Sequence, residues 1–190
     1  MNVALPRSLD VDQFLAWAVQ QEQGKFELID GVVVMQQSQQ WGHAKVKASM
    51  YVALSQAVGA AGAAFYVAPD GPTVRISKRR AFVPDALVAP LPEPARDSLE
   101  IPNPIIVVEV LSPSTAHIDM TAKLRGYFQV PSIQHYLIVD PNSSTITHHK
   151  RSSDDTLETR IVSEGALILD PPGLTLELSA VFGPARSAET

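Results

Sequence analysis

Ile105-Ile106-Val107-Val108-Glu109-Val110-Leu111 is the stretch that decides the fold. All of its residues except Glu109 are apolar, and a proline-bearing segment precedes it. A continuous apolar run of this length is typical of a central strand that is covered on both faces of its sheet. One acid inside such a strand is costly, so Glu109 must lie at an open strand end, be protonated, or share its charge with a cation or a base.

Two other runs are expected to meet this strand. Phe82-Val83-Pro84-Asp85 ends in a carboxylate on a neighbouring strand, and a helix is predicted from Asp119 to Phe128. On that helix, Lys123 can bring an ammonium group to the sheet edge beside the two acids. The structural alternative is that Asp119 and Lys123 form a surface helix pair worth about 0.3–0.5 kcal/mol. In that case, Asp85 is only a residue at a strand end.

Size and composition indicate a globular protein. The chain has 190 residues, of which 45% are hydrophobic and 18% are charged. A chain of this size and composition can bury a core, and it is not disordered throughout. We expect a single domain over residues 1–190, with residues 1–7 and 183–190 as frayed tails.

The cysteine count and the hydropathy pattern bear on the compartment. The chain has no cysteine, which excludes a disulfide framework and a thiolate zinc site and fits a reducing cytoplasm. No apolar stretch approaches the roughly 20 residues of a membrane span. Residues 1–7 lack the apolar centre of a signal peptide. We therefore predict a cytoplasmic protein with no membrane partner.

The rest of the pattern predicts an α+β fold. Helices are expected after the start signal Ser8-Leu9-Asp10 and from Trp41 to Gly59. Tight turns between apolar runs predict hairpins at Asp30-Gly31 and at Pro141-Asn142-Ser143-Ser144. Many strands with few helices favour a mixed central β-sheet flanked by helices, with extra β-hairpins.

The charge pattern restricts how the protein could contact nucleic acid. A net charge of -5 argues against a protein that coats nucleic acid, because such domains are usually basic. It does not exclude a nuclease, whose acids are balanced once a metal is bound. A basic patch leads into the Asp85 run and is the candidate for DNA phosphate contacts. Its members are Arg75, Lys78, Arg79 and Arg80. Lys45 and Lys47 are interpreted as part of a solvated surface.

Two acids with a lysine beside them suit the hydrolysis of a phosphodiester. Carboxylates from Asp85 and Glu109 can hold Mg²⁺, with Mn²⁺ as a substitute, and such an ion orients a phosphate and supplies hydroxide. Lys123 can help to deprotonate the attacking water or stabilise the charge of the transition state. Because two neighbouring acids repel each other, one of the pair is expected to hold a proton until metal binds.

Six short motifs occur in an order that resembles a known family. They are Phe26-Glu27-Leu28-Ile29-Asp30-Gly31, His43, Val83-Pro84-Asp85, Val108-Glu109-Val110-Leu111-Ser112-Pro113-Ser114-Thr115, the set Asp119, Lys123 and Tyr127, and Tyr136-Leu137-Ile138-Val139-Asp140-Pro141. From about residue 10 to 180 the chain resembles the Uma family (Uma-two) of restriction-endonuclease-like proteins, within the PD-(D/E)xK nuclease superfamily. The resemblance implies a restriction-endonuclease-like core with a divalent-metal site at one end.

The resemblance also assigns roles to residues. Asp85 and Glu109 correspond to the metal-binding acids, and Lys123 corresponds to the lysine. The wider superfamily places its lysine two residues after the second acid, where this chain has Leu111. The resembling family supplies the lysine from the next helix, so Lys123 takes this role only if that helix packs across the strand end.

Three further positions are implied. Glu27 corresponds to an additional catalytic acid of the site, and its structural alternative is an outward-facing position on an alternating strand. His43 and Asp119 match recurrent positions of the family with less definite, auxiliary roles, and the structural alternative for His43 is a hydrogen-bonding residue.

Three functions compete at this level. The leading hypothesis is a Mg²⁺-dependent endonuclease that hydrolyses DNA phosphodiester bonds, acting as a homodimer because the two strands of a duplex call for two active sites. The alternative is a catalytically inactive nuclease-fold module that binds nucleic acid or regulates a partner. A third class is an assembly protein that associates through exposed β-hairpins.

Overall fold

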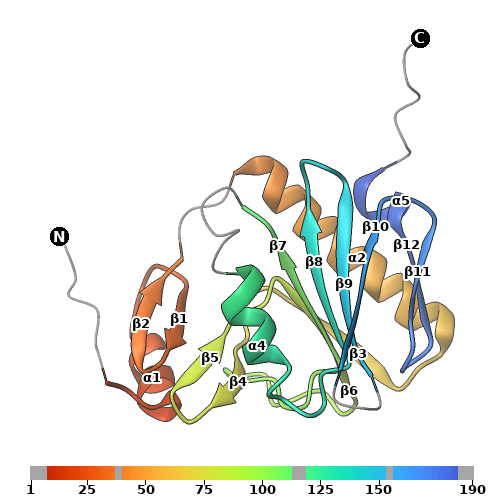
Figure 1. The fold of residues 1–190 in the computed structure, drawn as a ribbon. Helices are drawn as coiled ribbons and strands as arrows, with labels where there is room; N and C mark the ends of the chain where they lie inside the picture. Colours follow the sequence, from red (N-terminus) through yellow and green to blue (C-terminus); the bar gives the residue numbers. More distant parts are fainter. Residues whose placement is uncertain (1–7, 37–39, 113–118, 153–155, 184–190) are drawn as a thin grey trace.

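A six-stranded mixed sheet forms the centre of the molecule (Figure 1). The computed structural model describes residues 8–36, 40–112, 119–152 and 156–183, and the predicted tails lie mostly outside these ranges. In spatial order the strands are β10 (Leu157–Val162), β9 (Thr145–Arg151), β8 (His135–Asp140), β7 (Ile106–Val110), β6 (Ala86–Pro90) and β3 (Phe65–Pro69). β7 and β8 run parallel, and the other neighbouring pairs are antiparallel.

The stretch around Glu109 forms a central strand of this sheet, as predicted. All five residues of β7 are buried, between β6 on one side and β8 on the other. Val108 and Val110 belong to the core on one face, and Val107 belongs to the core on the opposite face. The continuous apolar run therefore reflects burial on both faces of the sheet.

Helices and a hairpin cover the two faces of the sheet. One face packs against α2 (Trp41–Ala61), α5 (Leu178–Phe182) and the hairpin of β11 (Ala166–Leu169) and β12 (Leu174–Glu177). The other face packs against a π-helical turn, η1 (Asp119–Lys123), and the short α4 (Leu124–Tyr127) that continues it. The predicted α+β class with a mixed sheet, flanking helices and extra hairpins is confirmed.

A second sheet of four strands lies beside the first (Figure 1). Its order is β2 (Val32–Met35), β1 (Phe26–Ile29), β5 (Arg80–Phe82) and β4 (Val74–Ser77), with α1 (Val11–Ala18) packed against it. Asp10 caps α1 by accepting from the Gln13 N–H, and the Gln13 side chain accepts from the Asp10 N–H. This capping box satisfies two of the unpaired amides of the first turn.

Local sequence signals end the other elements. Asp30 and Gly31 both have positive φ, at 53° and 83°, which is the conformation that a two-residue hairpin turn requires. Gly62 has a φ of 57° and closes α2 in the left-handed conformation. None of the helices in the described parts of the chain is both long enough and apolar enough to cross a membrane.

Candidate functional site

The buried acid of the central strand lies at the carboxyl end of β7. Glu109 is 4% exposed, and its Oε1 accepts hydrogen bonds from Lys123 Nζ at 2.9 Å and from Tyr127 Oη at 2.6 Å. Of the three possibilities left open by the sequence, sharing charge with a cation is the one observed. The helical segment that carries Lys123 packs across the strand end, as the family resemblance requires.

Glu27 reaches the same place from the second sheet. It lies on β1, is 5% exposed, and its Oε1 accepts from the Val83 N–H at 2.9 Å. Lys123 Nζ lies 3.1 Å from this oxygen, so one ammonium group bridges Glu27 and Glu109. The outward-facing alternative for Glu27 is therefore wrong, because tertiary packing turns the residue inward.

Asp85 joins the end of β7 through its backbone and its side chain. Its N–H donates to the Val108 carbonyl at 2.9 Å, and its Oδ2 accepts from the Val110 N–H at 2.7 Å. These two partners flank Glu109, so both acids converge at one edge of the sheet. Asp85 lies at the corner between β5 and β6 rather than on a strand, because Pro84 cannot donate to the ladder and the chain turns there.

A second lysine approaches Asp85 from α2. Lys47 is 7% exposed, and its Nζ lies 2.7 Å from Asp85 Oδ1. It also pairs with Asp70, which follows β3 and pairs in turn with Lys25. Lys25 Nζ lies 3.8 Å from Asp85 Oδ1. The interpretation of Lys47 as a solvated surface residue is therefore wrong.

The position of Lys47 could have been found from the helix spacing. His43, Lys47, Met50 and Leu54 lie at intervals of three or four residues, and all four are buried on one face of α2. His43 and Lys47 thus continue the apolar stripe of Met50 and Leu54 toward the start of α2. A polar side chain at a stripe position is a signal for a buried polar group.

Three groups near this end of β7 have shifted pKa values. Burial works to lower the pKa of Lys47, but attraction to Asp85 and Asp70 outweighs it and raises the pKa. Burial works to raise the pKa of Asp70, but its contacts with Lys25 and Lys47 lower it below the ordinary value. Burial and the charges of Glu109 and Glu27 hold the pKa of Tyr127 well above its usual range. Tyr127 therefore stays protonated and donates to Glu109.

His43 positions the strand end. Its Nε2 lies 2.6 Å from the Val110 carbonyl and 4.0 Å from Asp85 Oδ2. A carbonyl can only accept, so Nε2 carries a proton and donates to it. Nδ1 is buried and has no hydrogen-bond partner among the described residues. The side chain of Asp119 lies outside the described part of the structure, although the backbone of η1 begins there.

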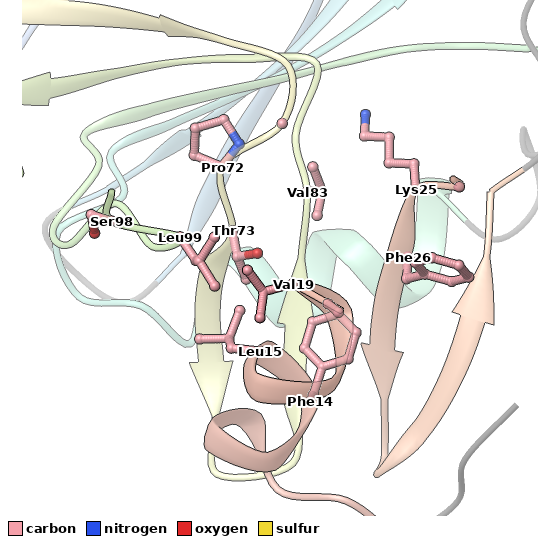
Figure 2. A pocket seen from close by; sticks show the side chains of 13 residues that line it. Phe14, Leu15, Val19, Lys25, Phe26, Pro72, Thr73, Val83, Ser98 and Leu99 are labelled. Carbon is pink, nitrogen blue, oxygen red and sulfur yellow. The ribbon is translucent and has the colours of Figure 1, made fainter. Parts of the chain in front are cut away.

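An apolar hollow of about 410 Å³ adjoins the network (Figure 2). Phe14, Leu15 and Phe26 contribute to its walls, and Val83 lines it two residues before Asp85. In Figure 2 the Lys25 side chain extends away from Phe14 and Leu15, and its Nζ pairs with Asp70. The ammonium group of Lys25 thus lies with Asp70 and Asp85, away from the apolar residues Phe14 and Leu15 that line the hollow.

The predicted phosphate-contact patch is engaged with acids on the surface. Arg75 donates to Glu100 at 2.8 Å and to Asp12 at 2.6 Å, and Arg80 donates to Asp30 at 2.5 Å. Lys78 and Arg79 are exposed. None of the contacts described for Arg75 and Arg80 joins them to Asp85 or Glu109.

The residues present fit a hard divalent cation. Asp85 and Glu109 offer carboxylate oxygens, the ligand type that Mg²⁺ prefers. Within the described ranges, no group of three or more His, Cys, Asp or Glu side chains gathers as a ready metal site. Mg²⁺ is commonly held by one or two carboxylates together with waters and substrate phosphates, so two acids are sufficient.

Comparisons with known proteins identify the family of the chain. Residues 11–182 match the family model Uma2, described as "Putative restriction endonuclease". Two uncharacterized proteins of Synechocystis sp. are 34% identical over 100 residues and 33% identical over 90 residues, which cover 52% and 46% of this chain. The matched regions span about half the length of these relatives, at 53% and 51%.

A solved structure shares the fold. A protein of Anabaena variabilis, described as a "putative nuclease", superposes with a TM-score of 0.71 and 17% sequence identity. The match covers 92% of this chain and 97% of that one. At this identity, the likeness supports the fold.

Proposed function

The chain belongs to the Uma2 family of restriction-endonuclease-like proteins, and on that premise we propose that it is a Mg²⁺-dependent endonuclease that hydrolyses DNA phosphodiester bonds. The observation that carries the proposal is the contact of Lys123 with Glu109 at the end of β7, where Asp85 is hydrogen-bonded to the two residues that flank Glu109. These residues come from distant parts of the chain, and all three are buried. A nuclease-like fold is supported independently by the structural match.

The roles follow from the contacts. Asp85 and Glu109 would hold the metal ion, which would supply a bound hydroxide and polarise the phosphate. Val110 N–H orients the Asp85 carboxylate, and Tyr127 orients that of Glu109. Lys123 places its positive charge between Glu27 and Glu109, where it can assist the attacking water or stabilise the transition state.

The proposal includes two copies of the chain in the cytoplasm. A symmetric homodimer would present one site to each strand of a duplex. The alternative function is a catalytically inactive nuclease-fold module that binds nucleic acid or regulates a partner. The pairing of Arg75 and Arg80 with surface acids favours the regulatory form of this alternative, because it leaves less positive charge for nucleic-acid phosphates.

Plasmid cleavage with Mg²⁺ or Mn²⁺ tests the proposal. Asp85→Asn and Glu109→Gln keep side-chain shape but remove the charge, and we expect each to lower cleavage by about 100-fold or more. Glu93→Gln, at an exposed acid, is the matched control and should cut like wild type. Circular dichroism verifies that each variant is folded. Undiminished cutting by folded Asp85→Asn or Glu109→Gln would reject the assignment.

A further inference from the structure

Lys47 and Asp70 belong to the network around Asp85, yet the proposed chemistry uses neither. Lys47 Nζ lies 2.7 Å from Asp85 Oδ1 and also pairs with Asp70. The Asp85 side chain is 7% exposed, whereas that of Asp70 is 30% exposed. One ammonium group thus connects a buried acid of the site to a more solvated acid beside it.

The geometry of Asp85 places Lys47 in competition with a metal ion. Oδ2 is held by the Val110 N–H, and Oδ1 faces Lys47 at 2.7 Å and Lys25 at 3.8 Å. A divalent ion that coordinates Oδ1 would meet an ammonium group at contact distance. Two cations this close in a buried site repel strongly, so Lys47 has to move when the ion binds. Lys47 Nζ already contacts the Asp70 carboxylate, so this carboxylate can hold the ammonium group after it leaves Asp85.

The sum of the charges near the end of β7 favours keeping Lys47 on Asp70 after the ion binds. Two groups of charges lie near the end of β7: Asp70 and Asp85 with Lys25 and Lys47, and Glu27 and Glu109 with Lys123. When all are ionised, the two groups together carry one surplus negative charge. A divalent ion would convert that surplus into one positive charge, which is equal and opposite to the charge of a phosphodiester. Retaining Lys47 on Asp70 therefore favours binding of the phosphate.

We propose that Lys47 is a counter-cation that occupies Asp85 in the metal-free protein and withdraws onto Asp70 when a divalent ion binds. Asp70 is then a positioning residue, because it acts through Lys47 and not by touching the ion. This inference rests on the proposed function, since it requires Asp85 to be a metal ligand.

Calorimetric titration of the metal-free protein with Mn²⁺ tests the inference without measuring activity. Lys47→Met removes the competing charge and keeps a long helix-forming side chain, so we expect Mn²⁺ to bind about tenfold more tightly. Lys45→Met removes the same charge from the exposed face of the same helix, and its affinity should stay within about twofold of wild type because solvent screens that charge. Lys47→Gln provides a second uncharged side chain if Lys47→Met does not fold.

A double-mutant cycle distinguishes positioning from simple attraction between Asp70 and the ion. Asp70→Asn leaves Lys47 with Asp85 as its acid partner in this network, so we expect Mn²⁺ binding to weaken by about threefold or more. In the Lys47→Met background the same change should alter affinity by less than about twofold. An equal effect in both backgrounds would mean that Asp70 attracts the ion directly, and would overturn its positioning role.

The outcomes separate this inference from the proposed function. If wild type binds Mn²⁺ and folded Lys47→Met binds it equally or more weakly, the counter-cation role is overturned and the metal site stands. If wild type does not bind and Lys47→Met does, the inference is supported in its strongest form. If neither binds, Asp85 is not a metal ligand, and the proposed function and the inference are both rejected.

Discussion

The two ends of the β7–β8 strand pair bury polar groups in opposite ways. At the carboxyl end of β7, Glu109 is buried as an ion pair with Lys123. At the amino end of β8, His135 lies opposite Ile106 in the parallel register and is fully buried against His148. The polar pair buried at the first end is charged, and the histidine pair buried at the second end is neutral.

The histidine pair is neutral at pH 7 because burial lowers the pKa of both rings. His135 Nε2 lies 2.7 Å from the Pro171 carbonyl, so Nε2 donates, and Nδ1 of the neutral ring accepts. Nδ1 lies 2.8 Å from His148 Nε2, which therefore donates to it. A second proton on His135, at Nδ1, would point at the N–H of His148 and is therefore unfavourable. Burial, the largest cause, lowers the pKa of both histidines to about 4.

This difference indicates why the charged end exists. A buried ion pair can often be replaced by apolar side chains with no loss of stability, and the histidine end shows that this sheet can bury polar groups without charge. Three lysines among four acids are therefore poorly explained by stability. Clustered buried charges of this kind are typical of a functional site.

The largest expected effect comes from breaking the charged end. Lys123→Met leaves Glu27 and Glu109 buried beside each other without their shared ammonium group, so we expect a loss of about 3–5 kcal/mol of unfolding free energy. Urea denaturation at pH 7.5 measures it. Adding Glu109→Gln to Lys123→Met should recover part of the loss, and Lys78→Met, at an exposed lysine, is the control. A loss no greater than that of the control would mean that these acids are not held as charges.

A smaller effect per residue is expected from protonating the histidine pair. The folded-state pKa values of His135 and His148, about 4, lie below the ordinary 6.5, so the unfolded state binds more protons between these values. The stability that the two neutral histidines contribute is therefore fully present above pH 6.5, and it is lost as the pH drops toward 4. At pH 5 the loss is on the order of 2 kcal/mol per histidine.

Urea denaturation at pH 7.5 and pH 5 measures this loss. His148→Gln retains a donor for His135 but cannot be protonated, so its loss between the two pH values should be smaller than that of wild type by about 2 kcal/mol, the contribution of one histidine. His149 has a lowered pKa because of burial and remains in both proteins. Equal pH dependence in wild type and His148→Gln would show that the histidine pair is not held neutral.

The smallest effect is expected from Arg151, a charged residue near the histidine pair. Arg151 donates to the carbonyls of Ile133, Phe128 and Val130 at 2.9–3.1 Å, and it is half-buried. Arg151→Met should cost about 1 kcal/mol, because no carboxylate is left behind and water can reach the carbonyls. Thermal unfolding monitored by circular dichroism measures this change. A loss as large as that of Lys123→Met would remove the distinction between the two ends.

Much of the fold could be predicted because its signals are local. The apolar run around Glu109 indicates a doubly covered strand, and the Asp30-Gly31 turn indicates the first hairpin. The acids Asp85 and Glu109 and the lysine Lys123 also stood out, because charged residues beside apolar runs conflict with the local pattern. Their roles in metal binding and catalysis stay predictions.

The sequence by itself determined the strands, the helices and the identity of the unusual acids, since hydrophobic period and turn chemistry act over a few residues. Only the tertiary structure decided which cation meets which acid. Lys123 pairs with Glu27 and Glu109, while Lys47 turns to Asp85 and Asp70. These partners are far apart in the chain, and the packing of α2 and η1 on opposite faces of the sheet brings them together.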